Sequence, residues 1–431
     1  MGLYNTENMI DTSAATASPA TTAGRWRFAA AAFLMQLCLG VLYAWSVFRG
    51  PLAELYGWSK AETIAPYRYS LLFFTLGMIV AGFWQDRKGP RLVASVGGLL
   101  LVTGCALAAW LGDSVRGLVL SYGVIGGLGV GFAYVTPIAT CVKWFPDRRG
   151  TIAGFAVLGF GSGPLVFGPL LQRLIGADAA AFAETIPRTF LIMAAIFGVC
   201  VIGTAQIYRV PPAGWRPPGW SPPQRAGAGR EEFRPAETLR TWQFWTLWGI
   251  YFMGTSVGLT AIGEAAPFLS EAAAAGAFLS TGAALGVMSV FNGAGRLCWG
   301  ALSDRIGRKP TVGLMFALHI AACLALLRGA TGFGAGLAGL AMIGFGFGGF
   351  LVLMPSITAD YFGSRSVGAN YGLLFTAYGL SGFFVPGYFA RLLDRARLEG
   401  GVASGYDQIF TVFAAAAAVG CAAVAILRRP R

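Results

Sequence analysis

Charged side chains are scarce in this 431-residue sequence, at 12% of the chain, against roughly 25% in ordinary soluble domains. Hydrophobic residues make up 56%, and the mean hydropathy is +0.63. No stretch is long and polar enough to form a separate soluble domain. This composition excludes a soluble globular protein and predicts an integral membrane protein.

Histidine and paired cysteine are also scarce. The chain has one histidine, His319, and seven cysteines, all within hydrophobic stretches and none in a CxxC pair. The sequence therefore predicts neither a disulfide framework nor a metal site. No Ser/His/Asp, Cys/His or metal-binding set lies at one depth of the membrane, so we expect neither an enzyme nor a bound cofactor.

What the sequence has instead is twelve hydrophobic stretches of about 20 residues with short connections, which predicts transmembrane helices rather than a β-barrel. Residues 1–24 lack the pattern of a cleaved signal and are interpreted as a disordered cytoplasmic tail. Residues 210–240, rich in proline, glycine and arginine, predict a cytoplasmic linker. It separates an N-terminal six-helix bundle over 25–209 from a C-terminal one over 241–431, which ends in a short basic tail.

The second half of the chain repeats the first at a constant spacing. The loop GFWQDRKGPR, with Asp86 and Arg87, returns as GALSDRIGRK, with Asp304 and Arg305. Proline and glycines of later spans return at the same spacing, which indicates duplication of a six-helix unit. Two such units in parallel orientation are typical of carriers that give alternating access to a central site.

The net charge of +13 does not indicate a nucleic-acid partner. If the N-terminus is cytoplasmic, the cytoplasmic segments carry most of the Lys and Arg, whereas the acidic residues divide about evenly between the two faces. This distribution follows the positive-inside rule, so the charge reports orientation in the lipid bilayer. We expect a monomer with both termini in the cytoplasm.

Arg296, in SVFNGAGRLCWG, is the one charge that the sequence does not assign to a membrane surface. Insertion of a charge at the bilayer centre costs about 2.5–3.5 kcal/mol on insertion scales, so a charged residue is found there only if it is paired with another group or has a function. Asn292, one helical turn earlier, can add a donor to the same anion. The pair predicts an anion site at mid-membrane; the alternative is an arginine held by backbone carbonyls. In the first half, Phe74 and Met78 occupy the matching positions.

The duplicated loop resembles the signature of the major facilitator superfamily, and GVLYAWSVF with NGAGRLCWGALSDRIGR resembles the oxalate/formate antiporter family, which includes bacterial monocarboxylate carriers. The resemblance implies an all-α fold of twelve transmembrane helices in two six-helix pseudo-repeats, in the inner membrane. It implies that Arg296 and Asn292 bind a substrate carboxylate and that Tyr134 and Phe375 line the pocket. It also implies cytoplasmic contacts that hold one conformation, made at the duplicated loops by Asp86, Arg87, Asp304 and Arg305.

One departure from that family favours a substrate class. The oxalate carrier has a lysine in the stretch that resembles FTAYG here, whereas this chain has Tyr378. A second carboxylate would be uncompensated in a low-dielectric cavity, so a small monocarboxylate such as lactate, pyruvate or formate is favoured over oxalate. The Tyr378 hydroxyl can donate a hydrogen bond to a hydroxyl or keto oxygen of the substrate.

The sequence does not decide which ion crosses the membrane together with the substrate or in exchange for it. Glu264, near the outer end of its span, and His319 are the candidates for proton coupling. Alternatively, Arg296 crosses the membrane only when an anion neutralises it, which gives either exchange for a counter-anion or joint entry of anion and proton. We predict a proton-coupled secondary active transporter of a small monocarboxylate. An oxalate/formate-type exchanger and a carboxylate sensor that does not transport are the alternatives.

Overall fold

The structure, a computed structural model, describes residues 24–212, 215–217, 232–273, 281–327, 333–363, 366–399 and 401–430. The predicted N-terminal tail and most of the predicted linker lie outside these ranges. Within them, all regular secondary structure is helical.

The first half of the chain is built from α-helices with four short 3₁₀ or π segments. In order, these elements are α1 (Trp26–Leu39), η1 (Gly40–Ala44), α2 (Ser46–Tyr56), α3 (Lys60–Lys88), α4 (Pro90–Leu111), α5 (Val115–Leu118), η2 (Val119–Gly126), α6 (Gly127–Trp144), α7 (Arg149–Ile175), η3 (Ala179–Ala181), α8 (Phe182–Phe197), η4 (Gly198–Ile202) and α9 (Gly203–Ala205).

The second half follows the same plan. Its elements are α10 (Pro235–Thr238), α11 (Trp242–Ala273), α12 (Thr281–Ile306), α13 (Arg308–Ala321), η5 (Ala322–Leu327), α14 (Phe333–Phe362), α15 (Val367–Leu398) and α16 (Val402–Ile426). Among the described residues, nine segments are helical, long and apolar enough to cross a membrane. Helices α11, α12 and α13 with η5 complete the predicted twelve spans, and the all-α membrane fold is confirmed.

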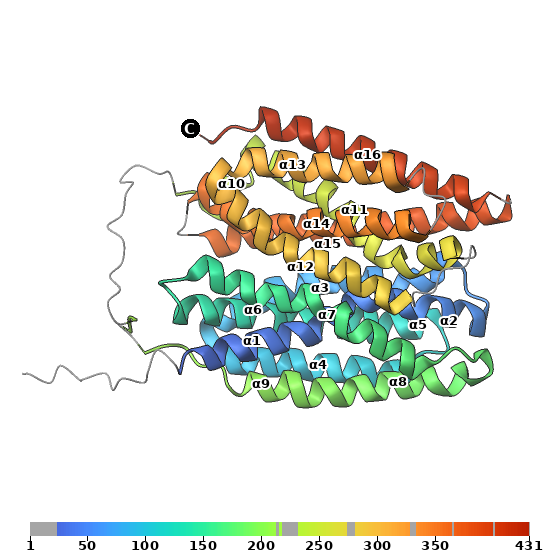
Figure 1. Cartoon of the computed structure of the whole chain (residues 1–431). Coiled ribbons are helices and arrows are strands. Elements are labelled where there is room, and N and C mark those ends of the chain that lie inside the picture. Colours follow the sequence, from blue (N-terminus) through green and yellow to red (C-terminus); the bar gives the residue numbers. More distant parts are fainter. Residues whose placement is uncertain are drawn as a thin grey trace, which may run out of the picture.

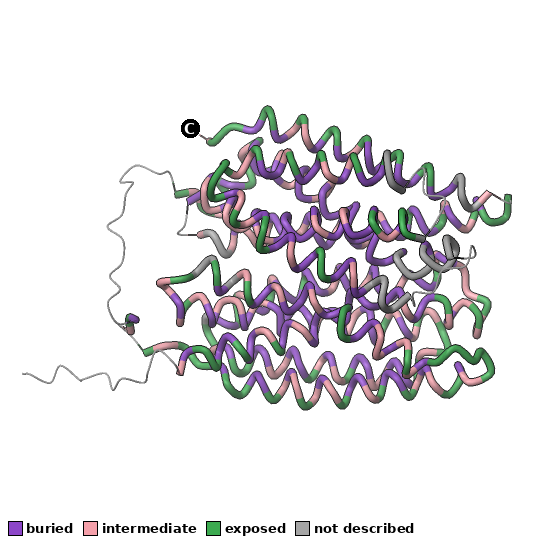
Figure 2. Tube along the Cα trace, in the orientation of Figure 1, coloured by how far each residue is buried: buried purple, intermediate pink, exposed green. Residues whose placement is uncertain are grey.

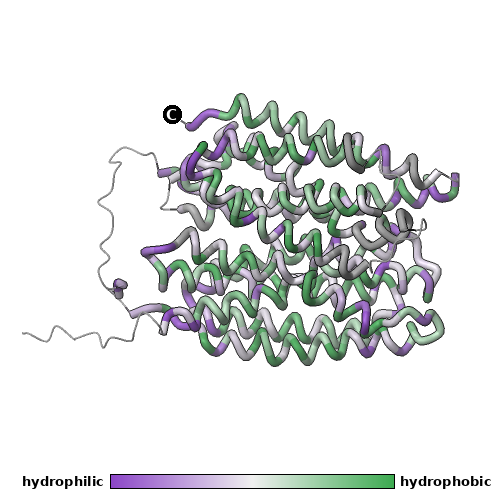
Figure 3. The backbone as a smooth tube through the Cα atoms, viewed as in Figure 1, coloured by the Kyte–Doolittle hydropathy of each residue, from purple (hydrophilic) through white to green (hydrophobic). Residues whose placement is uncertain are grey.

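The helices run roughly side by side, with the first half below the second in Figure 1. Hydrophilic residues gather towards the ends of the helices and apolar residues fill their middle lengths (Figure 3). We call the end where α9 precedes α10, and where α16 leads to the C-terminus, the linker end. The opposite end, where α2 leads to α3 and α15 to α16, is called the far end.

Two glycines at matching positions of the repeat turn the chain at the linker end. Gly89, between α3 and α4, has φ +80°, and Gly307, between α12 and α13, has φ +92°. Side chains with a Cβ rarely adopt this conformation, so glycine is the residue that suits both turns. The duplicated loop thus has the same backbone turn in each half.

Two helix pairs form most of the contact between the halves, α3 with α15 and α7 with α12, and α2 with α11 adds a smaller one. The residues along these contacts are largely buried, as the purple tube through the centre of Figure 2 shows. Close packing is possible because small residues face the partner helix: a Cβ on Gly379 of α15 would lie 2.4 Å from the hydroxyl oxygen of Thr75 on α3. The centre of the protein is therefore the contact between the halves.

The first span is not one regular helix. The hydrophobic pattern of residues 26–48 is that of a single transmembrane helix, whereas the structure divides this stretch into α1, η1 and α2. The change of helix type begins at Gly40, where a Cβ would lie 2.2 Å from the carbonyl oxygen of Phe160 on α7. This close approach of two backbones is available to glycine alone. The turn η1 that follows carries Tyr43, which is 1% exposed.

Candidate functional site

Arg296 lies in the middle of α12, with 1% of its surface exposed. Its Nε donates to the side-chain oxygen of Asn292, one turn earlier, at 3.0 Å. Its Nη1 donates to the main-chain oxygen of Val157 on α7, in the other half, at 2.8 Å. The remaining nitrogen, Nη2, is buried and has no hydrogen-bond partner among the described residues. The two N–H groups on this nitrogen of a buried cation are therefore left to bind a ligand.

The charge of Arg296 is balanced only by neutral oxygens. Among the described side chains, no carboxylate forms an ion pair with it; its acceptors are an amide oxygen and a main-chain carbonyl. A buried guanidinium with such partners keeps a net positive charge in a medium of low dielectric constant, which favours the binding of an anion. The amide oxygen of Asn292 and the main-chain carbonyl group of Val157 hold the arginine, and Nη2 stays open.

Glycines give the Arg296 side chain its space. A Cβ on Gly161 of α7 would lie 3.0 Å from Nε of Arg296, closer than most real Cβ contacts. Behind the pair, a Cβ on Gly348 of α14 would lie 2.2 Å from the carbonyl oxygen of Asn292. The hydroxyl of Ser289 donates to the carbonyl oxygen of Gly161, so α12 and α7 are bonded directly at the site.

Aromatic side chains from both halves surround this centre. The hydroxyl groups of Tyr43, from η1, and Tyr378, from α15, are hydrogen-bonded at 2.7 Å across the two halves. Phe375 stacks on Tyr378 with ring centroids 4.7 Å apart. Tyr134 of α6 packs edge to face on Phe74, at 5.0 Å. The hydroxyl groups of Tyr43 and Tyr134 both lie close enough to the Arg296 guanidinium to interact with it electrostatically.

A small cavity lies beside the pair and opens between the halves. It is lined by Tyr43, Gly161, Pro164, Ile262, Met288, Ser289 and Asn292. Its free space holds about one water molecule. An organic carboxylate is larger, so the halves must move apart for one to enter or leave.

The structure thus brings five predicted residues into one region between the halves: Arg296, Asn292, Tyr134, Phe375 and Tyr378. Phe74, which occupies the position of Asn292 in the first half, lies in the same aromatic cluster, within 5.8 Å of the ring of Tyr378. The residue that matches Asn292 in the first half is therefore part of the aromatic cluster around the site.

Two other predicted residues lie elsewhere. Glu264 of α11 is buried towards the far end and pairs with Arg49 of α2, with Oε1 2.6 Å from Nη1. The sequence places Glu264 near the outer end of its span; in the structure the side chains of Glu264 and Arg49 are 6% and 1% exposed. His319 is buried between α13 and α14, with Nε2 3.3 Å from the carbonyl oxygen of Ile343, so its contact is within the second half.

At the linker end, the duplicated loop of the second half holds a charge network. Asp304 pairs with Arg308 at 2.7 Å, and Arg308 also approaches Asp360 at 3.6 Å. Arg305 is exposed, as is Arg87 in the first loop. The side chain of Asp86 lies outside the described residues.

An ion pair that the sequence did not predict holds the start of α1 at this same end. Arg25 donates to both carboxylate oxygens of Asp147, at 2.7 and 2.9 Å. Asp147 lies in the loop between α6 and α7, and the hydrogen bonds from Arg25 lower the pKa of its carboxyl group below the ordinary value.

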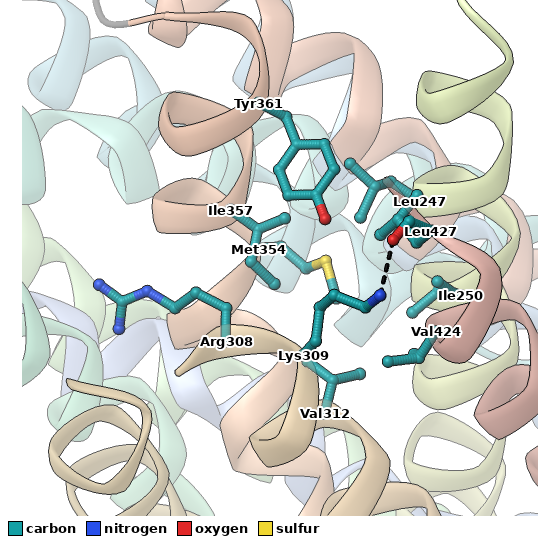
Figure 4. A pocket seen from close by; sticks show the side chains of 10 residues that line it. All are labelled: Leu247, Ile250, Arg308, Lys309, Val312, Met354, Ile357, Tyr361, Val424 and Leu427. Carbon is teal, nitrogen blue, oxygen red and sulfur yellow. Dashed lines mark hydrogen bonds between the residues drawn. The ribbon is translucent and has the colours of Figure 1, made fainter. Parts of the chain in front are cut away.

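A second pocket lies inside the second half at the linker end (Figure 4). Apolar side chains of α11, α13, α14 and α16 form most of its wall, and the ammonium group of Lys309 donates to the carbonyl oxygen of Leu427 at 2.7 Å. This bond ties α13 to the end of α16. Among the described residues, no three His, Cys, Asp or Glu side chains gather closely enough to hold a metal ion.

The sequence did not assign three contributions to the site. Tyr43 has one signal in the sequence, its place within the stretch GVLYAWSVF. Gly161 is one of several glycines in its span, and a glycine in a membrane helix more often serves close helix packing. The carbonyl group of Val157 carries no signal in the sequence, because every residue of a helix has one.

Comparisons with known proteins identify the family and the fold of the chain. A family model described as Major Facilitator Superfamily matches residues 18–386. The oxalate:formate antiporter of Oxalobacter formigenes is 30% identical over 377 residues, 85% of each chain. Apicoplast pyruvate carrier 1 of Toxoplasma gondii is 29% identical over 351 residues, 70% of this chain and 64% of that one. Among solved structures, the chain is similar to a bacterial homolog of the human lysosomal transporter Spinster, crystallised in an inward-facing and unoccupied conformation. The TM-score is 0.67 at 17% identity, over 94% of this chain and 97% of that one, so the two chains share the fold.

Proposed function

The chain belongs to the major facilitator superfamily, and from this premise we propose that it is a secondary active transporter of a small monocarboxylate of the lactate, pyruvate or formate kind. Arg296 binds the carboxylate between the halves, and the halves rock about it so that the site opens to one side of the membrane at a time. Asn292 holds the guanidinium in place, and Tyr134, Phe375 and Tyr378 enclose the rest of the anion.

The open nitrogen of Arg296 is the observation that supports this proposal most strongly. A guanidinium binds carboxylates through N–H groups that lie in one plane. Nη2 is the guanidinium nitrogen of Arg296 that has no hydrogen-bond partner among the described residues. When the site is empty, a net positive charge lies between the halves. When a monocarboxylate is bound, the site is neutral, and the central contact can then open to either side at lower electrostatic cost.

One cation at the site supports a single carboxylate. The described side chains around Arg296 are otherwise neutral, and Tyr378 offers a hydroxyl group rather than a second charge. A dicarboxylate would bring a second negative charge with no partner. The names of the relatives include both monocarboxylates and a dicarboxylate, since one relative is an oxalate:formate antiporter and another a pyruvate carrier.

We further propose that anion entry is coupled to protons, with Glu264 and His319 as the candidate carriers. The linker end faces the cytoplasm, both termini lie there, and the charge network that includes Asp304 helps to hold one conformation. Exchange of one anion for another is the second candidate, favoured by the similarity to the oxalate:formate antiporter of Oxalobacter formigenes. The two modes differ in whether a proton crosses with the anion.

Uptake of labelled lactate into proteoliposomes tests the proposal. One set of vesicles has an inward proton gradient and no internal anion; a second set has no gradient and is preloaded with unlabelled lactate or formate. Accumulation in the first set indicates proton-coupled symport, and uptake only in the second indicates exchange.

Vesicles that contain Arg296→Ala are the matched control, because the substitution removes the cation and keeps the helix. Binding of lactate by the purified protein without uptake in either set would instead identify a sensor. Uptake of equal size with Arg296→Ala would contradict the assignment of the site.

A further inference from the structure

An arginine of the first half lies across a helix of the second half, towards the far end. Nε of Arg68, on α3, donates to the carbonyl oxygen of Phe383 on α15, and its guanidinium carbon is 4.9 Å from the centroid of the Phe383 ring. A Cβ on Gly387, one turn later on α15, would overlap this guanidinium. Glycine therefore makes the room that the Arg68 side chain occupies between the two helices.

Among the described residues, no carboxylate forms an ion pair with Arg68 or with Arg391. Arg391 follows Gly387 by one further turn on the same side of α15, close enough to Arg68 to interact with it electrostatically. The carboxylate of Asp394, three residues later, accepts hydrogen bonds from main-chain N–H groups at the start of α3 instead. Two neighbouring cations repel each other, so an anion bound between them would stabilise both.

The surface beside these arginines is largely apolar and faces outward. Tyr388 and Phe384 of α15 are 64% and 56% exposed, and Leu76 of α3, deeper in the membrane than Arg68, is 45% exposed. Both helices are long and apolar enough to cross the membrane, so exposed side chains along their middle lengths contact acyl chains. Tyrosine is enriched at the level of the lipid headgroups. The two arginines thus lie beside a surface that suits a lipid.

Both arginines can reach the headgroup layer at the far end. Arg68 is eight residues from the first residue of α3, and Arg391 is seven residues from the last residue of α15, about 12 and 10 Å along the helix axes. With 29 residues, α3 is about 43 Å long, so it extends beyond a hydrocarbon core of about 30 Å at both ends. A long arginine side chain spans the remaining distance to a phosphate group.

We propose that Arg68 and Arg391 form a binding site for the phosphate group of an anionic phospholipid, where α3 contacts α15. The phosphate accepts hydrogen bonds from the two guanidinium groups, and an acyl chain lies along the exposed side chain of Phe384. Because Arg68 belongs to the first half and Arg391 to the second, one lipid binds both halves and strengthens their contact at the far end. This site is separate from the one around Arg296.

The internal repeat supplies a matched control for this site. Arg391 corresponds to Arg173, which is exposed near the end of α7, whereas Arg68 corresponds to Gly286. Arg173 thus has the position of Arg391 in the other half, without an arginine at the position that matches Arg68. The repeat also gives no reason for an arginine at position 68, which sets this residue apart from the scaffold.

Native mass spectrometry of the purified protein, without any carboxylate substrate, tests the site. Dioleoyl phosphatidylglycerol and dioleoyl phosphatidylcholine are titrated separately, and the affinity of the first bound lipid is measured; the two lipids share their acyl chains and differ in net charge. We expect the wild type to prefer phosphatidylglycerol. Arg68→Gln and Arg391→Gln should each lower the affinity for phosphatidylglycerol about fivefold, the usual contribution of one basic residue near an anionic lipid surface, and leave that for phosphatidylcholine little changed.

Arg173→Gln should keep the full preference for phosphatidylglycerol. Gly387→Ala retains both charges, but its Cβ would displace the Arg68 guanidinium, so it should weaken the binding of phosphatidylglycerol as Arg68→Gln does. Arg391 is exposed, so Arg391→Gln tests the site even if the loss of Arg68 prevents folding.

Equal affinity of the wild type for the two lipids would overturn the proposal. So would a loss of preference in Arg173→Gln as large as in Arg391→Gln. In a further arm, inorganic phosphate is added at the concentration of the lipid; displacement of phosphatidylglycerol would assign the site to a soluble anion and overturn the proposal as well. Because no substrate is present, none of these results bears on the anion that Arg296 binds.

Discussion

Tyr378 is the position at which a single substitution should change the class of anion that the site accepts. Its hydroxyl is bonded to that of Tyr43, and Tyr43 in turn lies beside the Arg296 guanidinium. A lysine at position 378 would therefore place a second cation on the opposite side of the same small region. We expect Tyr378→Lys to strengthen the binding of oxalate relative to lactate.

The size of this effect follows from the charges. Two opposite unit charges about 4 Å apart attract with about 4 kcal/mol at an effective dielectric constant of about 20. Desolvation of the lysine and of the second carboxylate offsets part of this gain. The lysine also loses the bond to Tyr43, although its stem can still lie along the ring of Phe375. A net gain of about 1.4–2.8 kcal/mol is expected, which is about 10- to 100-fold in oxalate affinity.

The assay is competition. Unlabelled oxalate or formate is added to proteoliposomes that take up labelled lactate, and the concentrations that halve uptake are compared for wild type and Tyr378→Lys. Tyr378→Met is the control, because it removes the hydroxyl and adds no charge. If oxalate competes no better in the lysine variant than in the methionine variant, while lactate uptake continues, the placement of position 378 beside the bound anion is refuted.

Two further predictions concern other parts of the structure. Gly161→Ala should raise the KM for lactate about 3- to 10-fold, because its Cβ would displace Nε of Arg296. Gly154→Ala is the control on the same helix: its Cβ would make only an ordinary van der Waals contact, so KM should not change. Equal effects of the two substitutions on KM would contradict the argument. Asp147→Asn should lower the melting temperature by about 1–3 °C at neutral pH, through the lost pair with Arg25. Since folding lowers the pKa of Asp147, this pair stabilises the protein above the unfolded value of about 3.9 and loses its effect as pH falls through the folded value. A difference between wild type and variant that persists in strong acid would count against it.

Much of the fold could be predicted from the sequence because the bilayer imposes simple requirements. Apolar stretches of the right length become helices, and the duplicated loops gave both the repeat and the family. The break in the first span could not be predicted from hydropathy, since it depends on the contact of Gly40 with the backbone of α7.

In the candidate site, too, some residues could be predicted from the sequence and others could not. Arg296 and Asn292 could be identified because a charge within an apolar stretch requires an explanation, and the absence of both from the first half set them apart from the scaffold. The pair of Arg49 with Glu264 could not be identified, because each residue alone looks like an ordinary charge at a membrane boundary. Their contact joins α2 to α11, and no local pattern reports a contact between such distant parts of the chain.

Calorimetric titration of lactate into the purified protein in nanodiscs, for the wild type and Arg296→Ala, tests the central claim most directly. A charge-assisted hydrogen bond is worth about 1.5–3 kcal/mol, so loss of one or two such bonds should weaken binding by at least about tenfold and up to about 10⁴-fold. The account predicts binding of one lactate per wild-type protein and a loss of that size in the variant, with the melting temperature of the protein little changed. Lactate that binds both proteins with the same affinity would contradict it.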